Sequence, residues 1–162
     1  MQGWHVLLRV FLDTNVLLDF VLGREPWRND AACLLQESHR ARKMKAYVAS
    51  LSLKDVYFTA SKMKSEPLAR QAVRMLMECC EIVEVGARTC LIALDGPEPD
   101  FEDGLIAAAA TECGADVIVS RDVTAFARLS VPKTSPSLFA AFFFSPSEYT
   151  QAIEEHHAVV AL

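Results

Sequence analysis

The chain has 162 residues, of which 52% are hydrophobic and 23% charged, and its formal net charge is −5. This composition excludes a disordered or low-complexity protein, and the length fits one domain with a sizeable core. The acidic balance argues against a general nucleic-acid binder, which typically has a basic surface.

Neither a membrane span nor a disulfide framework is expected. The longest apolar run, residues 4–22, is interrupted by His5, Arg9, Asp13 and Asp19, whereas a spanning helix needs about 18 uninterrupted apolar residues. The N-terminus shows no basic region followed by a cleavage site of small residues, which argues against a secretory signal. Five cysteines without C-x-x-C spacing argue against a zinc site. We therefore expect a cytoplasmic protein with no membrane partner.

Short β-rich runs alternate with longer helical patterns along the chain. In chain order, we expect a strand at 4–12, a helix at 29–44, a strand at 46–49, helices at 52–63 and 67–80, a strand at 81–85, a helix at 101–113 and strands at 116–120 and 129–131. Pro67 stands in the first turn of its helix, where a missing N–H costs nothing. Strands separated by helices need crossover connections. The pattern predicts an α/β three-layer sandwich with a central parallel sheet of four or five strands.

The end of the chain is aromatic and then weakly helical. We expect residues 1–144 to form a single domain and residues 145–162 to form a terminal helix or a mobile tail. The segment LFAAFFF, residues 138–144, is interpreted as a helix that docks on the core. The alternative is a dimer interface, because a patch of several Phe side chains is unfavourable in water.

Acidic residues lie at the places where the strands of such a sheet end. They follow the first strand, the second strand and the fourth strand, or flank the start of the Ala-rich helix: Asp13, Asp55, Asp122, Asp100 and Asp103. Ligands of open α/β sheets bind beyond the carboxyl ends of the strands. Crowded carboxylates raise one another's pKa values unless a cation neutralises them, and all-oxygen ligation suits Mg²⁺ or Mn²⁺ better than zinc. Such ions activate water towards phosphorus and stabilise the leaving oxygen, so the pattern favours metal-dependent phosphodiester hydrolysis.

Each of these carboxylates also has a structural interpretation. The alternative role of Asp13 is to cap a helix that starts near Asn15, but a role facing a ligand is favoured. For Asp55, a capping box with Ser52 is about as well supported as a functional role. Asp100 is interpreted as the N-cap of the helix at 101–113, and this structural role is favoured. Asp103 alternatively places a favourable charge in the first turn of that helix. Asp122 alternatively caps a short helix at 124–129.

Four segments together resemble PIN-domain proteins in order and spacing. They are LDTNVLLD at 12–19, SLSLKDVYFTASK at 50–62, DFEDGLIAAAA at 100–110 and ADVIVSRD at 115–122. The resemblance spans roughly residues 6–140. It implies a metal-dependent ribonuclease, since PIN domains have this activity, and the small bacterial members are often VapC-type toxins paired with an antitoxin.

The resemblance also assigns positions in the metal site. Asp13 matches the first metal ligand, Asp103 the third and Asp122 the fourth. Asp55 matches the second acidic position, where many members carry the longer Glu, and Asp100 matches an additional acid that acts through water.

Further residues match positions that support this site. Thr14 and Asn15 match motif residues that steady the first Asp by hydrogen bonds, and Ser120 precedes the last acid. Arg121 either pairs with a substrate phosphate or forms a structural salt bridge. A set of basic residues is a further source of phosphate contacts, against the alternative of ordinary solvated helix ends: Arg40, Arg42, Lys43, Lys45, Lys62 and Lys64.

The sequence thus predicts a ribonuclease that uses one or two Mg²⁺ or Mn²⁺ ions and no covalent nucleophile. Expected partners are an RNA substrate, an antitoxin and a second copy of the chain. Two alternatives stay open. One is a PIN-fold interaction module with weak or no catalysis that binds a basic partner segment, and the other is a small-molecule phosphohydrolase.

Overall fold

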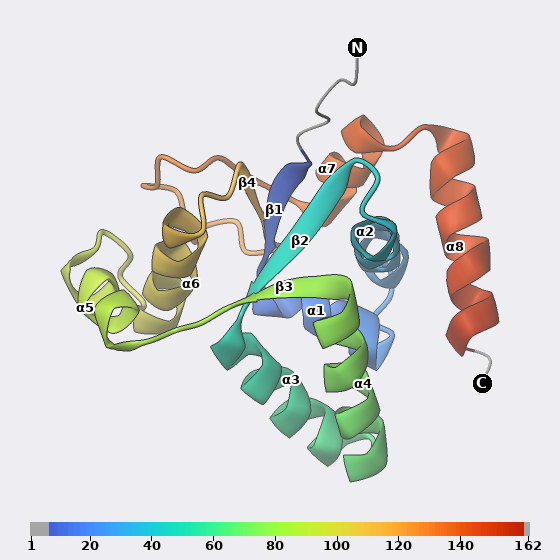
Figure 1. Cartoon of the computed structure of the whole chain (residues 1–162), viewed down its shortest axis with the longest axis horizontal. Coiled ribbons are helices and arrows are strands. Elements are labelled where there is room, and N and C mark those ends of the chain that lie inside the picture. The colour runs from blue at the N-terminus through green and yellow to red at the C-terminus, as the bar shows by residue number, and fades with distance from the viewer. Residues whose placement is uncertain (1–6, 161–162) are drawn as a thin grey trace.

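A parallel sheet of five strands forms the centre of the molecule (Figure 1). The computed structural model describes residues 7–160, and the side chains of residues 7–155. The strands are β1 (Leu8–Leu12), β2 (Met44–Ala49), β3 (Cys80–Val83), β4 (Val117–Val119) and β5 (Lys133–Thr134). They are arranged in the order β3-β2-β1-β4-β5, with Val10 of β1 in register with Ala46 of β2 and Val117 of β4.

Helices cover both faces of this sheet. They are α1 (Thr14–Leu22), α2 (Arg28–Arg40), α3 (Ser50–Met63), α4 (Glu66–Cys79), α5 (Ala87–Asp95), α6 (Phe101–Glu112), α7 (Pro136–Phe143) and α8 (Pro146–Val160). Figure 1 shows α5 and α6 on one side of the sheet and α1 and α2 on the other. The predicted three-layer α/β sandwich is confirmed.

The alternation of side chains along β1 creates two cores. Val10 and Leu12 belong to the core under α1 and α2, whereas Phe11 belongs to the core under α6. All three side chains are fully buried, as expected for a strand covered on both faces. The small residues of α6 let it approach closely. A Cβ at Gly104 would lie only 3.2 Å from the carbonyl oxygen of Ala93 in α5.

The first four strands and the four assigned helices lie within a few residues of their predicted positions, but the fifth strand does not. Residues 129–131 form a loop, and β5 begins after Pro132. Pro132 has no N–H to donate, yet its carbonyl oxygen accepts from Ile118 N at 2.9 Å and starts the pairing of β4 with β5. The first predicted strand began at residue 4, and residues 4–6 lie outside the described part.

One predicted helix is shorter than expected, and one helix was not predicted. The helix expected over 29–44 ends at Arg40, because Ala41 adopts a left-handed conformation with φ of 48° and Met44 already belongs to β2. The helix α5 was not predicted. It is short, and its apolar residues Leu91 and Leu94 are exposed. The apolar residues of this segment therefore do not show the periodic spacing that identifies a helix with one buried face.

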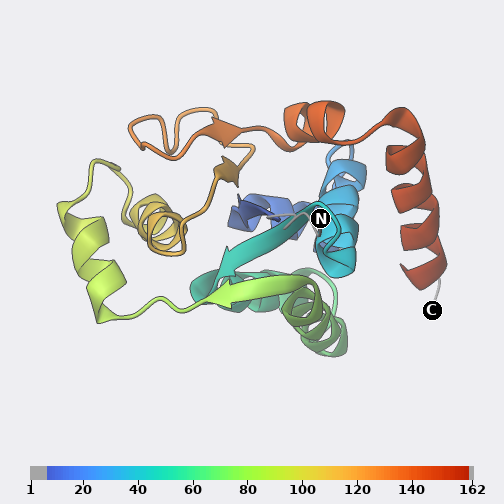
Figure 2. The ribbon, with the colours of Figure 1, turned by 45° about the horizontal axis from the view of Figure 1, so that its top comes forward.

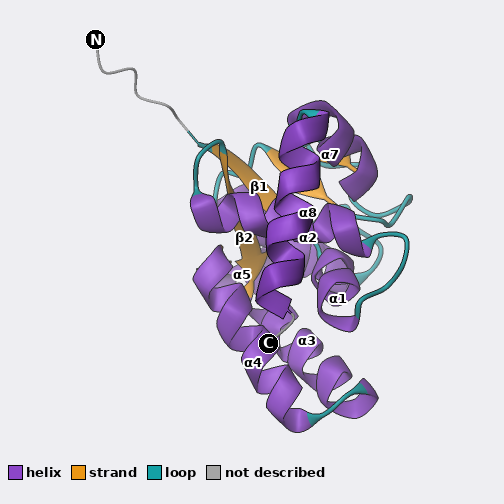
Figure 3. Ribbon diagram, turned by 90° about the vertical axis from the view of Figure 1, so that its right-hand side faces the viewer, coloured by secondary structure: helices purple, strands orange, loops and turns teal. Residues whose placement is uncertain are grey.

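Two helices, α7 and α8, follow β5 and end the described part of the chain. Helix α7 contains the expected aromatic segment, and Phe139 and Phe144 are buried, which confirms docking on the core. Helix α8 packs against the outer side of α2 (Figure 2). Helices α3 and α4 form a hairpin that extends away from the sheet (Figure 3). Over the described residues, none of the helices combines the length and apolar character needed to cross a bilayer.

Candidate active site

The carboxyl end of the sheet collects the starts of three helices. β1 leads into α1, β2 leads into α3, and α6 begins at the same end (Figure 1). This topology brings the five predicted acidic residues to one edge, which we call the acidic edge: Asp13, Asp55, Asp100, Asp103 and Asp122. Their environments differ, and the differences decide what each carboxylate can do.

Asp13 is the most constrained of these carboxylates. It is the N-cap of α1 and is only 7% exposed. Its Oδ1 accepts from Thr14 N at 2.7 Å, and its Oδ2 accepts from Ser120 Oγ at 2.6 Å and from Asn15 Nδ2 at 2.7 Å. Burial raises the pKa of Asp13, the nearby charge of Asp122 adds to the rise, and the three hydrogen bonds act against it. The carboxylate is thus fixed in orientation but costly to ionise.

The loop after β4 is tied to the start of α1. Asn15 Nδ2 also donates to Ser120 Oγ at 3.1 Å, and Asn15 Oδ1 accepts from Arg121 N at 3.2 Å. Ser120 Oγ further accepts from Asp122 N at 3.0 Å. The structure therefore brings the predicted supporting residues into contact with Asp13 and sets the direction in which Asp122 leaves the sheet.

A second tie joins α1 to α3. Thr14 Oγ1 and Ser52 Oγ lie 2.8 Å apart in a buried hydrogen bond. Helix α3 begins at Ser50, so Ser52 lies inside the helix. The proposed capping box of Ser52 with Asp55 is therefore wrong, because the helix starts earlier than the sequence pattern indicated. Ser52 instead holds α3 against the residue that follows Asp13.

The pKa of Asp103 is raised by burial and by neighbouring negative charges. Its pKa is raised to about 6, first by burial and then by the charges of Asp13, Asp100, Asp122 and Glu98. A shift with four acidic contributors means that these carboxylates lie within electrostatic reach of one another. The acidic edge thus holds enough negative charge to disfavour the ionised form of Asp103.

Asp122 has a different environment. Its Oδ1 accepts from Thr124 N at 2.7 Å, from Thr124 Oγ1 at 2.9 Å and from Ala125 N at 2.9 Å. These bonds lower the pKa of Asp122, the bonds to the two peptide N–H groups being the main causes. Asp122 thus caps the backbone of the following residues, as its structural interpretation predicted. Residues 124–129, however, form turns and a loop and not the expected short helix.

Asp100 caps α6, as its favoured structural interpretation predicted. Its Oδ1 accepts from Glu102 N at 2.9 Å and from Asp103 N at 3.1 Å. Glu102, which sequence reasoning missed, lies near several acids. Burial raises the pKa of Glu102 first, followed by the charges of Asp55, Asp100 and Asp13. Its place between Asp100 and Asp103 in a first helical turn was the available signal.

Asp55 stands at the rim of the acidic edge, beside a cation. Its Oδ1 lies 2.7 Å from Lys54 Nζ, and its side chain is 25% exposed. The charge of Asp55 acts on Glu102, which in turn lies near Asp13. Asp55 therefore joins the cluster through Glu102, and Lys54 is the second residue that sequence reasoning did not single out.

Arg121 is engaged inside the protein. Its Nη2 donates to Asp19 Oδ1 at 3.0 Å, its Nε lies 2.5 Å from Asp19 Oδ2, and its guanidinium stacks over Trp27 at 4.1 Å. Asp19 is fully buried. Of the two predicted roles for Arg121, the structure contains the salt bridge. The guanidinium group is directed at Asp19 and not at solvent.

The predicted basic residues lie away from the acidic edge. The loop between α2 and β2 is at the amino end of the sheet (Figure 1). There Arg40 pairs with Glu155, and Lys43 Nζ lies 2.5 Å from Glu148 Oε1. Lys62 stacks over Phe58 at 4.1 Å near the far end of α3. The residues at the amino end are thus separated from the acidic edge by the length of the sheet, and Lys62 by most of the length of α3, so phosphate contacts from this group stay a prediction.

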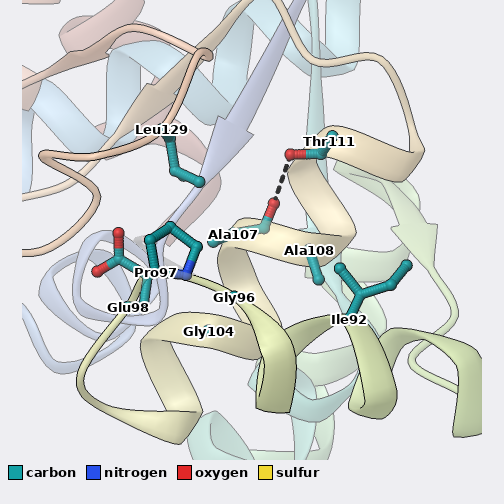
Figure 4. Close-up of a pocket in the computed structure, with 9 residues that line it drawn as sticks. All are labelled: Ile92, Gly96, Pro97, Glu98, Gly104, Ala107, Ala108, Thr111 and Leu129. Atoms are coloured by element: carbon teal, nitrogen blue, oxygen red, sulfur yellow. Dashed lines mark hydrogen bonds between the residues drawn. The ribbon is translucent and has the colours of Figure 1, made fainter.

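A small cavity behind α6 does not compete as a substrate site. It has a volume of about 70 Å³ and lies between α5, α6 and Leu129 (Figure 4), whereas ligand pockets usually measure about 300–1,000 Å³. At its edge, Glu98 Oε2 accepts from Phe126 N at 3.1 Å. Phe126 has a left-handed φ of 64°, so Glu98 holds a strained turn of the loop that carries Asp122.

The acidic edge has suitable donors for a hard cation. Among the described side chains, no three His, Cys, Asp or Glu groups lie close enough together to hold a metal ion as they stand. The chemistry of the donors nevertheless fits Mg²⁺ or Mn²⁺, because they are carboxylates and the ionised forms of Asp13 and Asp103 are disfavoured in the protein alone. A bound cation would reverse that penalty.

Comparison with known proteins agrees with this architecture. The sequence pattern of the PIN domain matches residues 9–124. No curated protein matches the chain. A structure of VapBC2 from Rickettsia felis, bound to a DNA fragment from the promoter, is similar with a TM-score of 0.58 and 17% identity, over 79% of this chain and 98% of that chain.

Two further solved structures show the same fold. A toxin–antitoxin complex from Klebsiella pneumoniae has a TM-score of 0.58 and 18% identity, over 78% of this chain and 97% of its own. The Mycobacterium tuberculosis toxin VapC20, described as cleaving the sarcin–ricin loop, has a TM-score of 0.56 and 14% identity, over 71% and 91%.

Proposed function

Because the chain belongs to the PIN-domain family, we propose that it is a ribonuclease that hydrolyses RNA phosphodiester bonds with the help of Mg²⁺ or Mn²⁺. The observation that carries the proposal is the crowding of carboxylates at the acidic edge. Asp13 is buried and fixed by three hydrogen bonds, and Asp103 is surrounded by acids that raise its pKa to about 6. Sites with such perturbed carboxylates are typical of bound cations and catalysis.

The carboxylates divide into ligands and supporting groups. Asp13 and Asp103 would hold a divalent ion, because their charges are the least satisfied by the protein itself. Asp122 would add a ligand oxygen, Asp100 would act through water, and Asp55 would complete the rim. One or two ions supply charge neutralisation on the phosphate and activation of water when bound.

The protein's own contribution is orientation. Ser120 and Asn15 fix Oδ2 of Asp13, and the Thr14–Ser52 hydrogen bond holds α3 beside it. No side chain is proposed as a covalent nucleophile, so water attacks phosphorus. Such preorganisation lowers the reorganisation needed when charge develops in the transition state.

The comparisons also support a biological setting. The similar structure from Klebsiella pneumoniae is a toxin–antitoxin complex, and VapC20 from Mycobacterium tuberculosis is a toxin. We therefore propose that this chain acts as the toxin of such a pair in the cytoplasm, with an antitoxin as its partner and a homodimer as its assembly. The antitoxin would suppress the ribonuclease.

The test is cleavage of a mixed RNA pool by purified, antitoxin-free protein in EDTA, Mg²⁺ and Mn²⁺. We expect cleavage in the metal arms alone, and a loss of at least about a hundredfold in Asp13→Asn, which removes a ligand charge at almost constant volume. Asp95→Asn, at the exposed end of α5, is the matched control and should cut like the wild type.

Three outcomes would contradict parts of the proposal. Equal cleavage by Asp13→Asn would refute the site. Cleavage of phosphomonoesters but not of RNA would favour a small-molecule phosphohydrolase. Absence of cleavage by folded protein that still binds a basic peptide through Asp13 would favour an interaction module.

A further inference from the structure

Besides any ions at the cutting site, proteins that bind RNA contact backbone phosphates with basic side chains. Arg121, Lys133 and Lys54 are basic side chains with contacts at the acidic edge, and Arg128 contacts the carbonyl oxygen of Pro97 beside it at 3.4 Å. Arg121 is held by Asp19 and Trp27. Lys133 Nζ donates to the carbonyl oxygens of residues 122, 123 and 125, at 2.9, 2.9 and 2.6 Å. Both are therefore occupied by the fold.

Lys54 is placed differently. It lies near the start of α3, just beyond the carboxyl end of β2, and its side chain is 78% exposed. Its Nζ lies 2.7 Å from Asp55 Oδ1.

The contact of Lys54 with Asp55 joins an exposed ammonium group to the partly buried carboxylate of the next residue in the helix. Such surface pairs contribute little to stability, because water screens the charges and two side chains lose freedom. The ammonium can therefore turn from Asp55 to another anion at small cost. A lysine ammonium is a compact point charge with three donors that suits phosphate oxygens.

Building on the proposed ribonuclease function, we propose that Lys54 binds a backbone phosphate of the RNA and positions the strand beside Asp13 and Asp103. Two observations carry this inference: the exposure of Lys54 at the acidic edge, and the engagement of Arg121 and Lys133 elsewhere. The assignment also explains how an acidic chain meets a polyanion, since the basic group at the amino end of the sheet lies too far away.

The experiment measures RNA binding separately from cleavage. A short fluorescein-labelled single-stranded RNA is titrated with wild-type protein, Lys54→Ala, Lys54→Arg and Lys62→Ala in EDTA at several salt concentrations. Lys62 is the matched control, because it is an exposed lysine two turns further along the same helix. Thermal melting checks that each variant is folded.

We expect Lys54→Ala to weaken binding about five- to tenfold and to reduce the slope of log Kd against log salt by about 0.7, the value for one phosphate contact on a single strand. Lys54→Arg should restore the slope, and Lys62→Ala should match the wild type. A purely structural role would leave this slope unchanged.

Several results would overturn the inference. These are equal binding by Lys54→Ala and wild type, equal weakening by Lys54→Ala and Lys62→Ala, or no RNA binding by the wild type. The parallel cleavage assay in Mg²⁺ keeps the two proposals apart. Cleavage with an unchanged KM in Lys54→Ala refutes the role of Lys54 alone, whereas Lys54-dependent binding without any metal-dependent cleavage refutes the ribonuclease alone.

Discussion

The two ends of the sheet handle charge in opposite ways. At the amino end, Arg40 at the end of α2 and Lys43 on the following loop pair with Glu155 and Glu148 of α8. At the carboxyl end, Asp103 lies among four acids that raise its pKa to about 6. Compensated charges at the amino end fasten a terminal helix. Crowded negative charges at the carboxyl end destabilise the free protein, and such a cost is typical of a site that awaits a ligand.

Arg121 is a paired charge at the carboxyl end, because it forms an ion pair with buried Asp19. Its removal should have the largest effect on stability. Arg121→Met leaves Asp19 without its close partner, with only Arg24 at 3.9 Å, and we expect a loss of about 3 kcal/mol in the free energy of unfolding. Urea denaturation measures the loss.

Arg128→Met serves as the control for Arg121→Met, because Arg128 is exposed and makes one long contact to the carbonyl of Pro97 at 3.4 Å. A double variant that also carries Asp19→Asn should recover part of the stability, since it removes the unpaired charge. Equal losses in Arg121→Met and Arg128→Met would show that the buried pair contributes nothing special.

Asp103→Asn should stabilise the metal-free protein, because it removes a negative charge from the crowded carboxyl end of the sheet. The pKa of Asp103 is about 6 in the folded chain and 3.8 ordinarily, so the folded state holds this proton more tightly than the unfolded state. Wild-type stability in EDTA should therefore fall as pH rises from 3.8 to about 6, and the variant should be the more stable protein above that range. Urea denaturation across this range measures both effects.

The control for this prediction is Asp95→Asn, which removes an exposed charge away from the acidic edge. Mg²⁺ should stabilise the wild type more than Asp103→Asn, because a ligand raises the stability of the state that binds it. A gain in Asp103→Asn that does not depend on pH would contradict the role of charge repulsion.

The smallest effect is expected at the amino end. Lys43, and then Ser145, lower the pKa of Glu148 to about 2, so the ionised form contributes stability above 4.5 that is lost as pH falls towards 2. Glu148→Gln should lower the melting temperature slightly at neutral pH, and the difference should shrink in acid. RNA cleavage should not change, and any large loss of cleavage would break the proposed separation of the two ends.

The sequence predicted the parts of the fold that depend on local pattern. The apolar run before Asp13 predicted β1, and the Ala-rich segment after Asp100 predicted α6 and its cap. The fifth strand was misplaced because Pro132 indicated an end of pairing, whereas its carbonyl oxygen begins it. A strand of two residues carries too little periodicity to be located from sequence alone.

For the candidate site, the sequence by itself determined which carboxylates follow the strand ends, because a parallel sheet brings its carboxyl ends to one edge. Only the tertiary structure decided which charges have partners. Asp19 and Arg121 are 102 positions apart in the chain, and Lys43 and Glu148 are 105 apart. Such pairings depend on where the crossovers place helix ends in space. Side-chain spacing along the chain carries no record of that placement, so the exposed Lys54 and the buried Asp19 became visible only in the folded protein.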